Sequence, residues 1–436
     1  MNQVGAETGE AREASLWRGE SPPRIRWTIC ATLFAATSIN YMDRQVIGLL
    51  KPTLQSSIGL TEVNYGYIVA AFQVAYTVGL MAAGRLVDRV GTRVGYLLFM
   101  ALWSLAAVAH ALVRSVVGLG IARFFLGLGE AGNFPAAVKT VADWFPQGER
   151  SLATGIFNSG ANVGAVVAPI IVPWITLKFG WRGAFLATGL ISLPWMAWWF
   201  KNYRAPSEHR MLTESGLHGI SQEAGVQPGR DIPWRKLLAY RQTWAFSMAK
   251  FLTDPIWWFY LFWLPSFFDS RFHLGLSHLG LPLIVVYNIS AIGSIAGGWL
   301  PALFRRVPMD AAKARMCAML VCAVMVLPVL GAGSLNSKWA AIGLVSVAAA
   351  AHQGWSANLF TIASDMFPGG AVGTVVGIGG MAGSIGGVLF SIGAGEILEV
   401  THSYGVLFAI SAGVYLLSIA ILHVLVPDLK KLDITS

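Results

Sequence analysis

Long apolar stretches recur along the chain, each about the length of a membrane-crossing helix, with short polar segments between them. A spanning helix needs about 20 mostly apolar residues, and the pattern predicts twelve such helices. The expected spans are residues 25–50, 63–84, 94–113, 116–140, 152–177, 183–200, 243–268, 280–304, 311–330, 337–363, 371–398 and 404–426. We therefore expect an all-α polytopic membrane protein.

The longest polar stretch, at about residues 200–242, divides the predicted helices six and six. Transporters built from two repeated halves have this layout, and the halves rock around a site near mid-membrane. The predicted organisation is a cytoplasmic tail (1–24), a first six-helix bundle (25–200), a cytoplasmic linker (201–242), a second six-helix bundle (243–426) and a cytoplasmic tail (427–436).

Charged residues are scarce and mostly basic, and their placement predicts the orientation. They make up 12% of the chain, with 31 Lys and Arg against 22 Asp and Glu. An even number of spans places both termini on the same side of the membrane. Of the Lys and Arg residues, 22 lie in segments on that side and 6 in segments on the opposite side. Basic loops favour the cytoplasm, so we expect both termini inside and a multi-pass inner (plasma) membrane protein. The scatter over short loops argues against a nucleic-acid partner.

The first predicted span carries adjacent ionisable residues, Asp43 and Arg44, in the block Asn40-Tyr41-Met42-Asp43-Arg44. An ionised side chain inside an apolar helix costs roughly 3 kcal/mol unless it faces a cavity or a partner. These residues therefore indicate a site. The alternative is an ion pair that serves only a neighbouring helix.

The fourth span carries Arg123 and Glu130, seven residues apart and so on one helix face. Desolvation disfavours the charged form of a carboxylate in apolar surroundings, which is what a proton carrier needs. The alternative is that both residues pair structurally with Asp43 and Arg44.

Polar and aromatic residues in other spans are further candidates for substrate contacts. On the fifth span, Asn158 and Asn162 suit sugar hydroxyls and helix packing equally well. His352 is similarly balanced between a ligand contact and a bond to another helix. The remaining candidates are Gln73, Tyr76, Trp258, Gln353, Asn358 and Ser384.

The loop between the second and third spans reads Gly84-Arg-Leu-Val-Asp88-Arg89-Val-Gly91-Thr-Arg93. We expect Gly84 and Gly91 to permit a tight turn, and Asp88 to pair with an Arg or a helix N-terminus. Such a charge network can stabilise one conformation of the two halves and so act as a latch. The alternative is a solvated basic loop that only sets the membrane topology. The corresponding loop of the second half keeps Arg305 and Arg306 but has no equivalent Asp, so the latch is expected to be asymmetric.

Motifs for other chemistry are missing from the sequence. No phosphate-binding Gly-Lys-Ser/Thr loop, hydrolase nucleophile motif or clustered metal-ligand set occurs. The three cysteines, Cys30, Cys317 and Cys322, have neither disulfide nor metal spacing. We expect no cofactor and no metal, and no enzyme activity.

Together, the loop motif, the Asn-Tyr-x-Asp-Arg block and the Arg123-to-Glu130 pattern resemble the anion:cation symporter family of the major facilitator superfamily. Segments around Lys250-Phe-Leu-Thr-Asp254-Pro and Ala351-His352-Gln353 resemble its hexuronate branch. The resemblance implies two pseudo-symmetric six-helix bundles and a monomer.

For the site, the resemblance implies that Arg44 binds the substrate carboxylate and that Tyr41 and Tyr76 contact the substrate. Asp43 and Glu130, with Arg123, would couple transport to protons.

The expected function is proton-coupled symport of a sugar acid such as glucuronate or galacturonate. The same motifs fit another organic anion, such as an aldonate, tartrate or an aromatic acid. A polytopic membrane enzyme or receptor is a further alternative.

Overall fold

The computed structural model describes residues 22–145, 147–205, 234–304, 311–367 and 369–427, together with residues 429 and 432. Within these residues the regular structure is helical. The first half contains α2 (Pro22–Ile58), α3 (Glu62–Leu112), α4 (Val116–Glu130), α5 (Asn133–Trp144), α6 (Gln147–Leu190) and α7 (Ser192–Asn202). The second half contains α9 (Trp234–Leu237), α10 (Arg241–Phe272), η2 (Leu276–His278), α11 (Gly280–Phe304), α12 (Ala311–Val326), η3 (Leu327–Gly331), α13 (Lys338–Met366), α14 (Gly369–Thr401) and α15 (Gly405–Leu425).

Glycines with positive φ turn the chain inside two of the long helices. Gly91 (φ 80°) divides α3 and Gly180 (φ 73°) divides α6, each between two predicted spans. Residues with a Cβ rarely adopt this backbone conformation. The prediction of a turn is therefore correct for Gly91 but wrong for Gly84, which lies in the regular helical part of α3 because the chain reverses only seven residues later.

When α3 is divided at Gly91 and α6 at Gly180, the described residues form the twelve expected spans. They are α2, the two parts of α3, α4 with α5, the first part of α6, its second part with α7, α10, α11, α12 with η3, α13, α14 and α15. The predicted fold class is confirmed. By length and apolar composition alone, seven stretches of the described residues qualify as membrane spans. Others are broken, as at α4 and α5, or carry ionisable side chains, as in α2 and α10.

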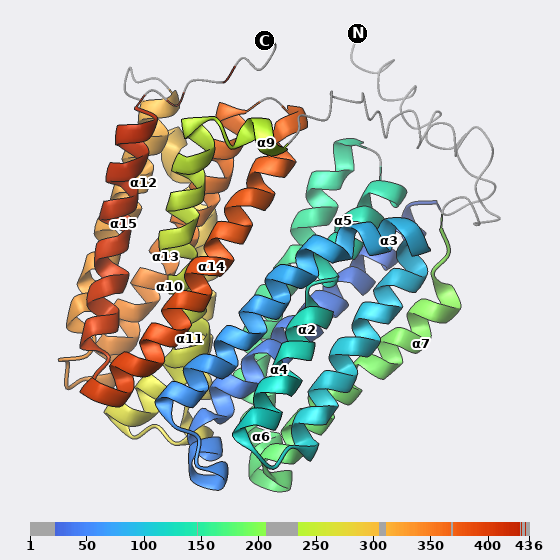
Figure 1. The fold of residues 1–436 in the computed structure, drawn as a ribbon, viewed down its shortest axis with the longest axis vertical. Coiled ribbons are helices and arrows are strands. Elements are labelled where there is room, and N and C mark those ends of the chain that lie inside the picture. Colours follow the sequence, from blue (N-terminus) through green and yellow to red (C-terminus); the bar gives the residue numbers. More distant parts are fainter. Residues whose placement is uncertain are drawn as a thin grey trace.

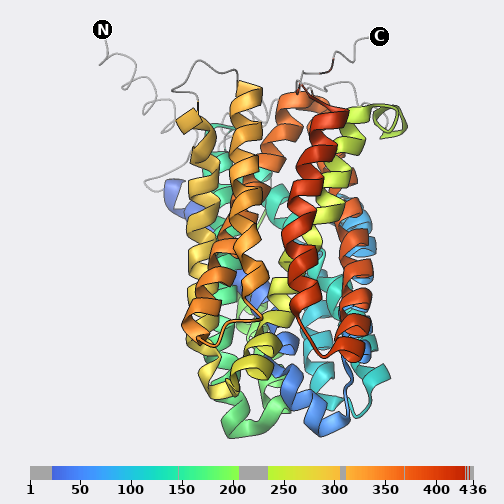
Figure 2. The ribbon, with the colours of Figure 1, turned by 90° about the vertical axis from the view of Figure 1, so that its left-hand side faces the viewer.

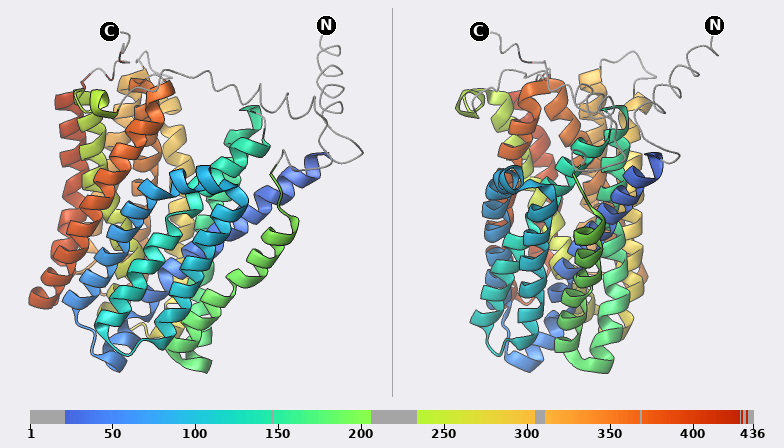
Figure 3. Two further views of the ribbon diagram at one scale, coloured as in Figure 1. Left: turned by 45° about the vertical axis from the view of Figure 1, so that its right-hand side comes forward. Right: turned by 90° about the vertical axis from the view of Figure 1, so that its right-hand side faces the viewer.

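The two halves form separate bundles that lie side by side (Figures 1 and 3), and Figure 2 views the second half in front of the first. We call the end where α2 begins and α15 ends the terminal end, and the opposite one, where α2 ends and α3 begins, the far end. The bundles converge toward the far end and diverge toward the terminal end (Figures 1 and 3). The predicted domain boundaries remain predictions, since residues 1–21 and 206–233 and most of the C-terminal tail lie outside the described residues.

Helices inside each bundle approach one another closely at glycines. A Cβ added to Gly129 of α4 would lie 2.6 Å from the backbone nitrogen of Trp103 in α3. In the second half, Gly297 of α11 packs against Gly354 of α13. Lipid tails are as apolar as the side chains they compete with, so close van der Waals packing holds such bundles together.

The halves meet through α3 with α14, α6 with α11, and α2 with α10. Near the far end, the Tyr65 hydroxyl donates a hydrogen bond to the Phe262 carbonyl (2.8 Å). The Glu62 backbone N–H donates to Glu399 Oε2 (2.9 Å). A carboxylate of the second half thus sits at the N-terminus of α3, where the helix dipole favours negative charge.

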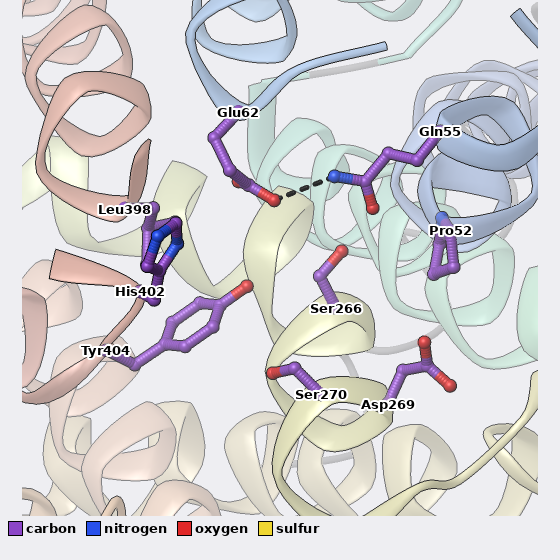
Figure 4. Close-up of a pocket in the computed structure, with 9 residues that line it drawn as sticks. All are labelled: Pro52, Gln55, Glu62, Ser266, Asp269, Ser270, Leu398, His402 and Tyr404. Atoms are coloured by element: carbon purple, nitrogen blue, oxygen red, sulfur yellow. Dashed lines mark hydrogen bonds between the residues drawn. The ribbon is translucent and has the colours of Figure 1, made fainter. Parts of the chain in front are cut away.

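A polar cavity of about 200 Å³ lies at this far-end contact, between α2, α3, α10 and the end of α14. Figure 4 shows its lining, in which Gln55 donates to Glu62 (2.9 Å) beside the hydroxyls of Ser266 and Tyr404. Glu62 also pairs with the fully buried Lys51 (2.5 Å). Desolvation raises the pKa of the Asp269 carboxyl, which lines the same cavity.

Candidate substrate site between the two halves

A buried ion pair joins α2 to α4 in the first half. Arg44 Nε donates to Glu130 Oε2 at 2.8 Å, and the two side chains are 3% and 0% exposed. Arg44 Nη2 donates to Asn40 Oδ1, one turn earlier on α2 (3.2 Å). α4 ends at Glu130, so the carboxylate lies at a helix break rather than within a continuous helix.

Four aromatic rings surround the Arg44 guanidinium. Its central carbon lies 4.6 to 5.3 Å from the ring centroids of Tyr41, Tyr76, Phe72 and Trp258. Trp258 comes from α10, so both halves contribute to this group, which we call the Arg44 cluster. Tyr41, Tyr76 and Trp258 are only partly buried, so the cluster has an accessible edge. A guanidinium stacks on aromatic faces while keeping its in-plane donors free for an anion.

Arg123 lies next to the cluster and holds the backbone of α2. Its Nη2 donates to the Arg44 carbonyl (2.5 Å), and its charge lies 4.9 Å from the Phe72 ring and 5.6 Å from the Phe262 ring. Arg123 and Glu130 thus approach the same residue, Arg44, as their shared helix face predicts. Arg44 and Arg123 are both buried near Glu130, and Arg123 also interacts electrostatically with Asp43. The group therefore carries excess positive charge only when one of the two carboxyl groups is protonated.

The Asp43 side chain lies near the second part of α6 and interacts electrostatically with Glu130 and Arg123. It lies beside Thr188 and is 2% exposed. Within the described residues, neither of its carboxylate oxygens has a hydrogen-bond partner by distance and angle. A buried carboxyl group without such partners is costly within a membrane helix, so Asp43 is a candidate functional residue.

Other predicted substrate contacts of the first half occupy different places. Gln73 is buried at the contact between halves, where its Oε1 accepts a hydrogen bond from Ser391 of α14 (3.1 Å). On α6, Asn158 is exposed and Asn162 is partly buried. Gly160 and Gly164 of the same helix pack closely on α2.

The predicted contacts of the second half divide into engaged and accessible groups. His352 Nδ1 is hydrogen-bonded to the Tyr415 hydroxyl (2.6 Å), and Asn358 Nδ2 donates to the carbonyls of Gly297 and Gly354. The bonds to Tyr415 and to Gly297 join different helices of the bundle, and the bond to Gly354 lies within α13. Gln353 and Ser384 are partly buried. The substrate roles assigned to all these residues remain predictions.

The predicted latch loop is held to α7. Arg93 Nη2 donates to the Phe200 carbonyl (2.5 Å), and the Trp199 ring nitrogen donates to the Arg93 carbonyl (3.1 Å). Arg89 is exposed. The side chain of Asp88 lies outside the described residues, as do Arg305 and Arg306 of the second loop.

Sequence reasoning missed Phe72 and quoted Asn40 only as part of a motif, without giving it a contact in the site. Asn40 lies four residues before Arg44, and Phe72 lies four before Tyr76, so helical spacing places each on the face of a predicted site residue. That spacing was the available signal. Within the described part of the chain, no group of three or more His, Cys, Asp or Glu is placed to hold a metal ion.

Comparison with known proteins identifies the family. The sequence profile of the Major Facilitator Superfamily matches residues 33–391. The chain belongs to this superfamily. It is a membrane transporter and not an enzyme.

Individual members of the superfamily resemble the chain over most of its length. It is 31% identical to the hexuronate transporter of Escherichia coli K12 over 393 residues, which cover 89% of this chain and 91% of that one. It is 35% identical to the galacturonate transporter of Dickeya chrysanthemi over 287 residues, covering 65% and 83%. The crystal structure of a D-xylose-proton symporter has the same fold, with a TM-score of 0.74 at 14% identity, covering 93% of this chain and 99% of that one.

Proposed function

We propose that this superfamily member is a proton-coupled symporter that carries a hexuronate, such as glucuronate or galacturonate, into the cell. The Arg44 cluster supports this proposal, since a buried guanidinium with an accessible aromatic edge suits a small organic anion. The similarity to hexuronate and galacturonate transporters supports the sugar-acid class.

In the proposed binding mode, Arg44 holds the substrate carboxylate through its planar donors. Arg binds carboxylates with two parallel N–H bonds, which fix orientation as well as adding energy. Tyr41, Tyr76 and Trp258 then contact the sugar ring and its hydroxyls. Contributions from both halves let the substrate stabilise a state in which the halves are closed around it.

The observation that carries the coupling is the 2.8 Å bond between Arg44 and Glu130. The Glu130 carboxylate binds the same Arg44 guanidinium that the substrate carboxylate would bind. Two carboxylates at one arginine repel each other, and protonation of Glu130 removes one of these charges. Substrate and proton therefore bind together, and release of the proton to the cytoplasm restores the Arg44–Glu130 pair and expels the substrate. Asp43 serves as a second proton carrier in this scheme.

The proposed orientation places the terminal end in the cytoplasm of a cell with an inner membrane. Basic loops on that side support it. Contacts between the halves at the far end then correspond to a state closed toward the outside. The loop of Asp88 acts as a latch at the cytoplasmic end, and the transporter works as a monomer.

A different organic anion, such as an aldonate, tartrate or an aromatic acid, is the alternative substrate. The Arg44 cluster suits any small carboxylate, so a competition experiment is needed to identify the transported anion. A panel of unlabelled anions against labelled glucuronate in vesicles separates the two possibilities.

The direct test uses the purified full chain in proteoliposomes. We expect labelled glucuronate or galacturonate to accumulate when the outside is acidic relative to the inside, and accumulation to collapse when a protonophore is added. Uptake that is equal with and without the gradient would contradict proton coupling. No uptake of either hexuronate would contradict the substrate class.

A further inference from the structure

The second half contains a buried ion pair that the proposed binding mode leaves unused. Lys250 Nζ lies 2.8 Å from Asp254 Oδ2 and 3.1 Å from Oδ1. The Lys250 side chain is 6% exposed and that of Asp254 is 22% exposed. Lys250 crosses from α10 to the neighbouring helices, with its ammonium 4.2 Å from the Phe360 ring of α13 and its stem against Gly379 of α14.

Burial of this ion pair within the helix bundle is energetically unfavourable. Burying two charges costs several kcal/mol that their attraction only partly returns. Ionisable residues within membrane helices therefore indicate a functional site rather than a stabilising contact. Asp254 keeps an accessible part, which a purely structural pair does not need.

Helical spacing places the pair beside the Arg44 cluster. Lys250, Asp254 and Trp258 are each four residues apart on α10, so they share one face of the helix. Trp258 lies in the Arg44 cluster. Each step of four residues advances about 6 Å along a helix, so Asp254 lies one turn from the cluster, toward the terminal end. Ser384 follows Gly383, the residue of α14 that packs on Asp254.

A sugar acid held by its carboxylate at Arg44 presents hydroxyl groups to the second half. An ionised carboxylate accepts hydrogen bonds from hydroxyls, and these charge-assisted bonds are the strong ones. Lys250 neutralises the charge of Asp254 and so limits its repulsion of an anionic substrate. Among the second-half residues predicted to contact the substrate, His352 and Asn358 already bond to other helices, whereas Gln353 and Ser384 are partly buried.

We propose that Asp254, positioned by Lys250, accepts hydrogen bonds from the hydroxyls of the bound sugar acid and so selects polyhydroxylated acids over plain carboxylates. This inference rests on the proposed function, because it takes the sugar acid as the substrate. It adds a selectivity residue on the half of the molecule opposite to the carboxylate anchor.

The test is competition binding on the full-length protein, with glucuronate and hexanoate as competitors of one labelled hexuronate. Asp254→Asn keeps the size of the side chain but removes the charged acceptor. We expect glucuronate affinity to fall about tenfold or more, the loss of a charge-assisted hydrogen bond, while hexanoate affinity changes less than twofold. Asp365→Asn is the matched control, because Asp365 also pairs at 2.8 Å, with Arg315, but does so between α12 and α13.

Three outcomes distinguish the claims. Loss of glucuronate preference in Asp254→Asn alone supports the proposal. Unchanged preference, or an equal loss for both competitors, overturns it while leaving the proposed function intact. A wild-type protein that binds no hexuronate overturns the proposed function and this inference with it. If an unpaired Lys250 prevents folding of Asp254→Asn, the double variant Lys250→Met/Asp254→Asn gives the same readout without a buried charge.

Discussion

Replacing Arg44 by lysine separates the charge of the site from its geometry. In the structure, Arg44 donates from two nitrogens at once, to Glu130 at 2.8 Å and to Asn40 at 3.2 Å. A lysine ammonium is a compact point charge that cannot reproduce this planar fork. It can still pair with Glu130, so we expect Arg44→Lys to fold and to remain in the membrane.

The expected loss follows from the contacts that disappear. One charge-assisted hydrogen bond to the substrate carboxylate contributes about 1.5–3 kcal/mol. Affinity for glucuronate should therefore fall by about 10- to 150-fold. The assay is equilibrium binding of labelled glucuronate to purified protein, with thermal unfolding in detergent to confirm the fold. Arg241→Lys, at an exposed position at the start of α10, is the control.

Binding by Arg44→Lys within a factor of two of wild type would refute this reasoning. The carboxylate would then be held elsewhere, and the buried Arg123 and Lys250 are the next candidates. A parallel loss in Arg241→Lys would show that the assay reports on general damage rather than on the site.

The remaining predictions concern conformational equilibria and packing. Asp88→Asn should slow exchange between inward-open and outward-open states with substrate affinity nearly unchanged, so initial uptake rates are compared with equilibrium binding; equal losses in both would exclude a latch. Glu399→Ala removes the carboxylate at the N-terminus of α3, a contact of up to about 1 kcal/mol, and should raise thiol labelling of a Ser266→Cys reporter in the far-end cavity up to about fivefold; unchanged labelling would contradict a closing role. Gly164→Ala places a Cβ 2.9 Å from Tyr41 Cβ and should destabilise the fold by about 1–3 kcal/mol, whereas Gly155→Ala on the same helix meets open space; equal unfolding temperatures would contradict the packing argument.

The twelve spans could be predicted from the sequence because an apolar run of membrane-spanning length is a strong signal. The sequence signals for turns and helix breaks were weaker. The turn at Gly91 was predicted, but the break between Glu130 and Asn133 was not, since the apolar pattern continues across it. That break matters, because it leaves the Glu130 carboxylate at the end of a helix and beside Arg44.

The first-half site was partly predictable because its motifs are local. Tyr41 and Arg44 are close in sequence, whereas Glu130 lies 86 residues from Arg44. The sequence could therefore offer the pairing of Arg44 with Glu130 only as an alternative, and the fold shows it. The second half is harder to predict. Its helices are apolar on most sides, so periodicity does not show which face His352 or Asn358 occupies. Lys250 and Asp254 are four residues apart, so helical spacing makes them neighbours, but their position one turn from the Arg44 cluster follows from the contact of Trp258.

The central claim is that Glu130 exchanges a proton while competing with the substrate for Arg44, and Glu130→Gln tests it most directly. Glutamine keeps the shape of the protonated acid and has no proton to release. In proteoliposomes, counterflow of labelled against unlabelled glucuronate should survive, because it needs no net proton movement, while uptake driven by a proton gradient should fail. Asp43→Asn in the same two assays shows whether the second carboxylate is also coupled. Gradient-driven accumulation by Glu130→Gln at the wild-type level would contradict the account and leave Glu130 as a structural partner of Arg44.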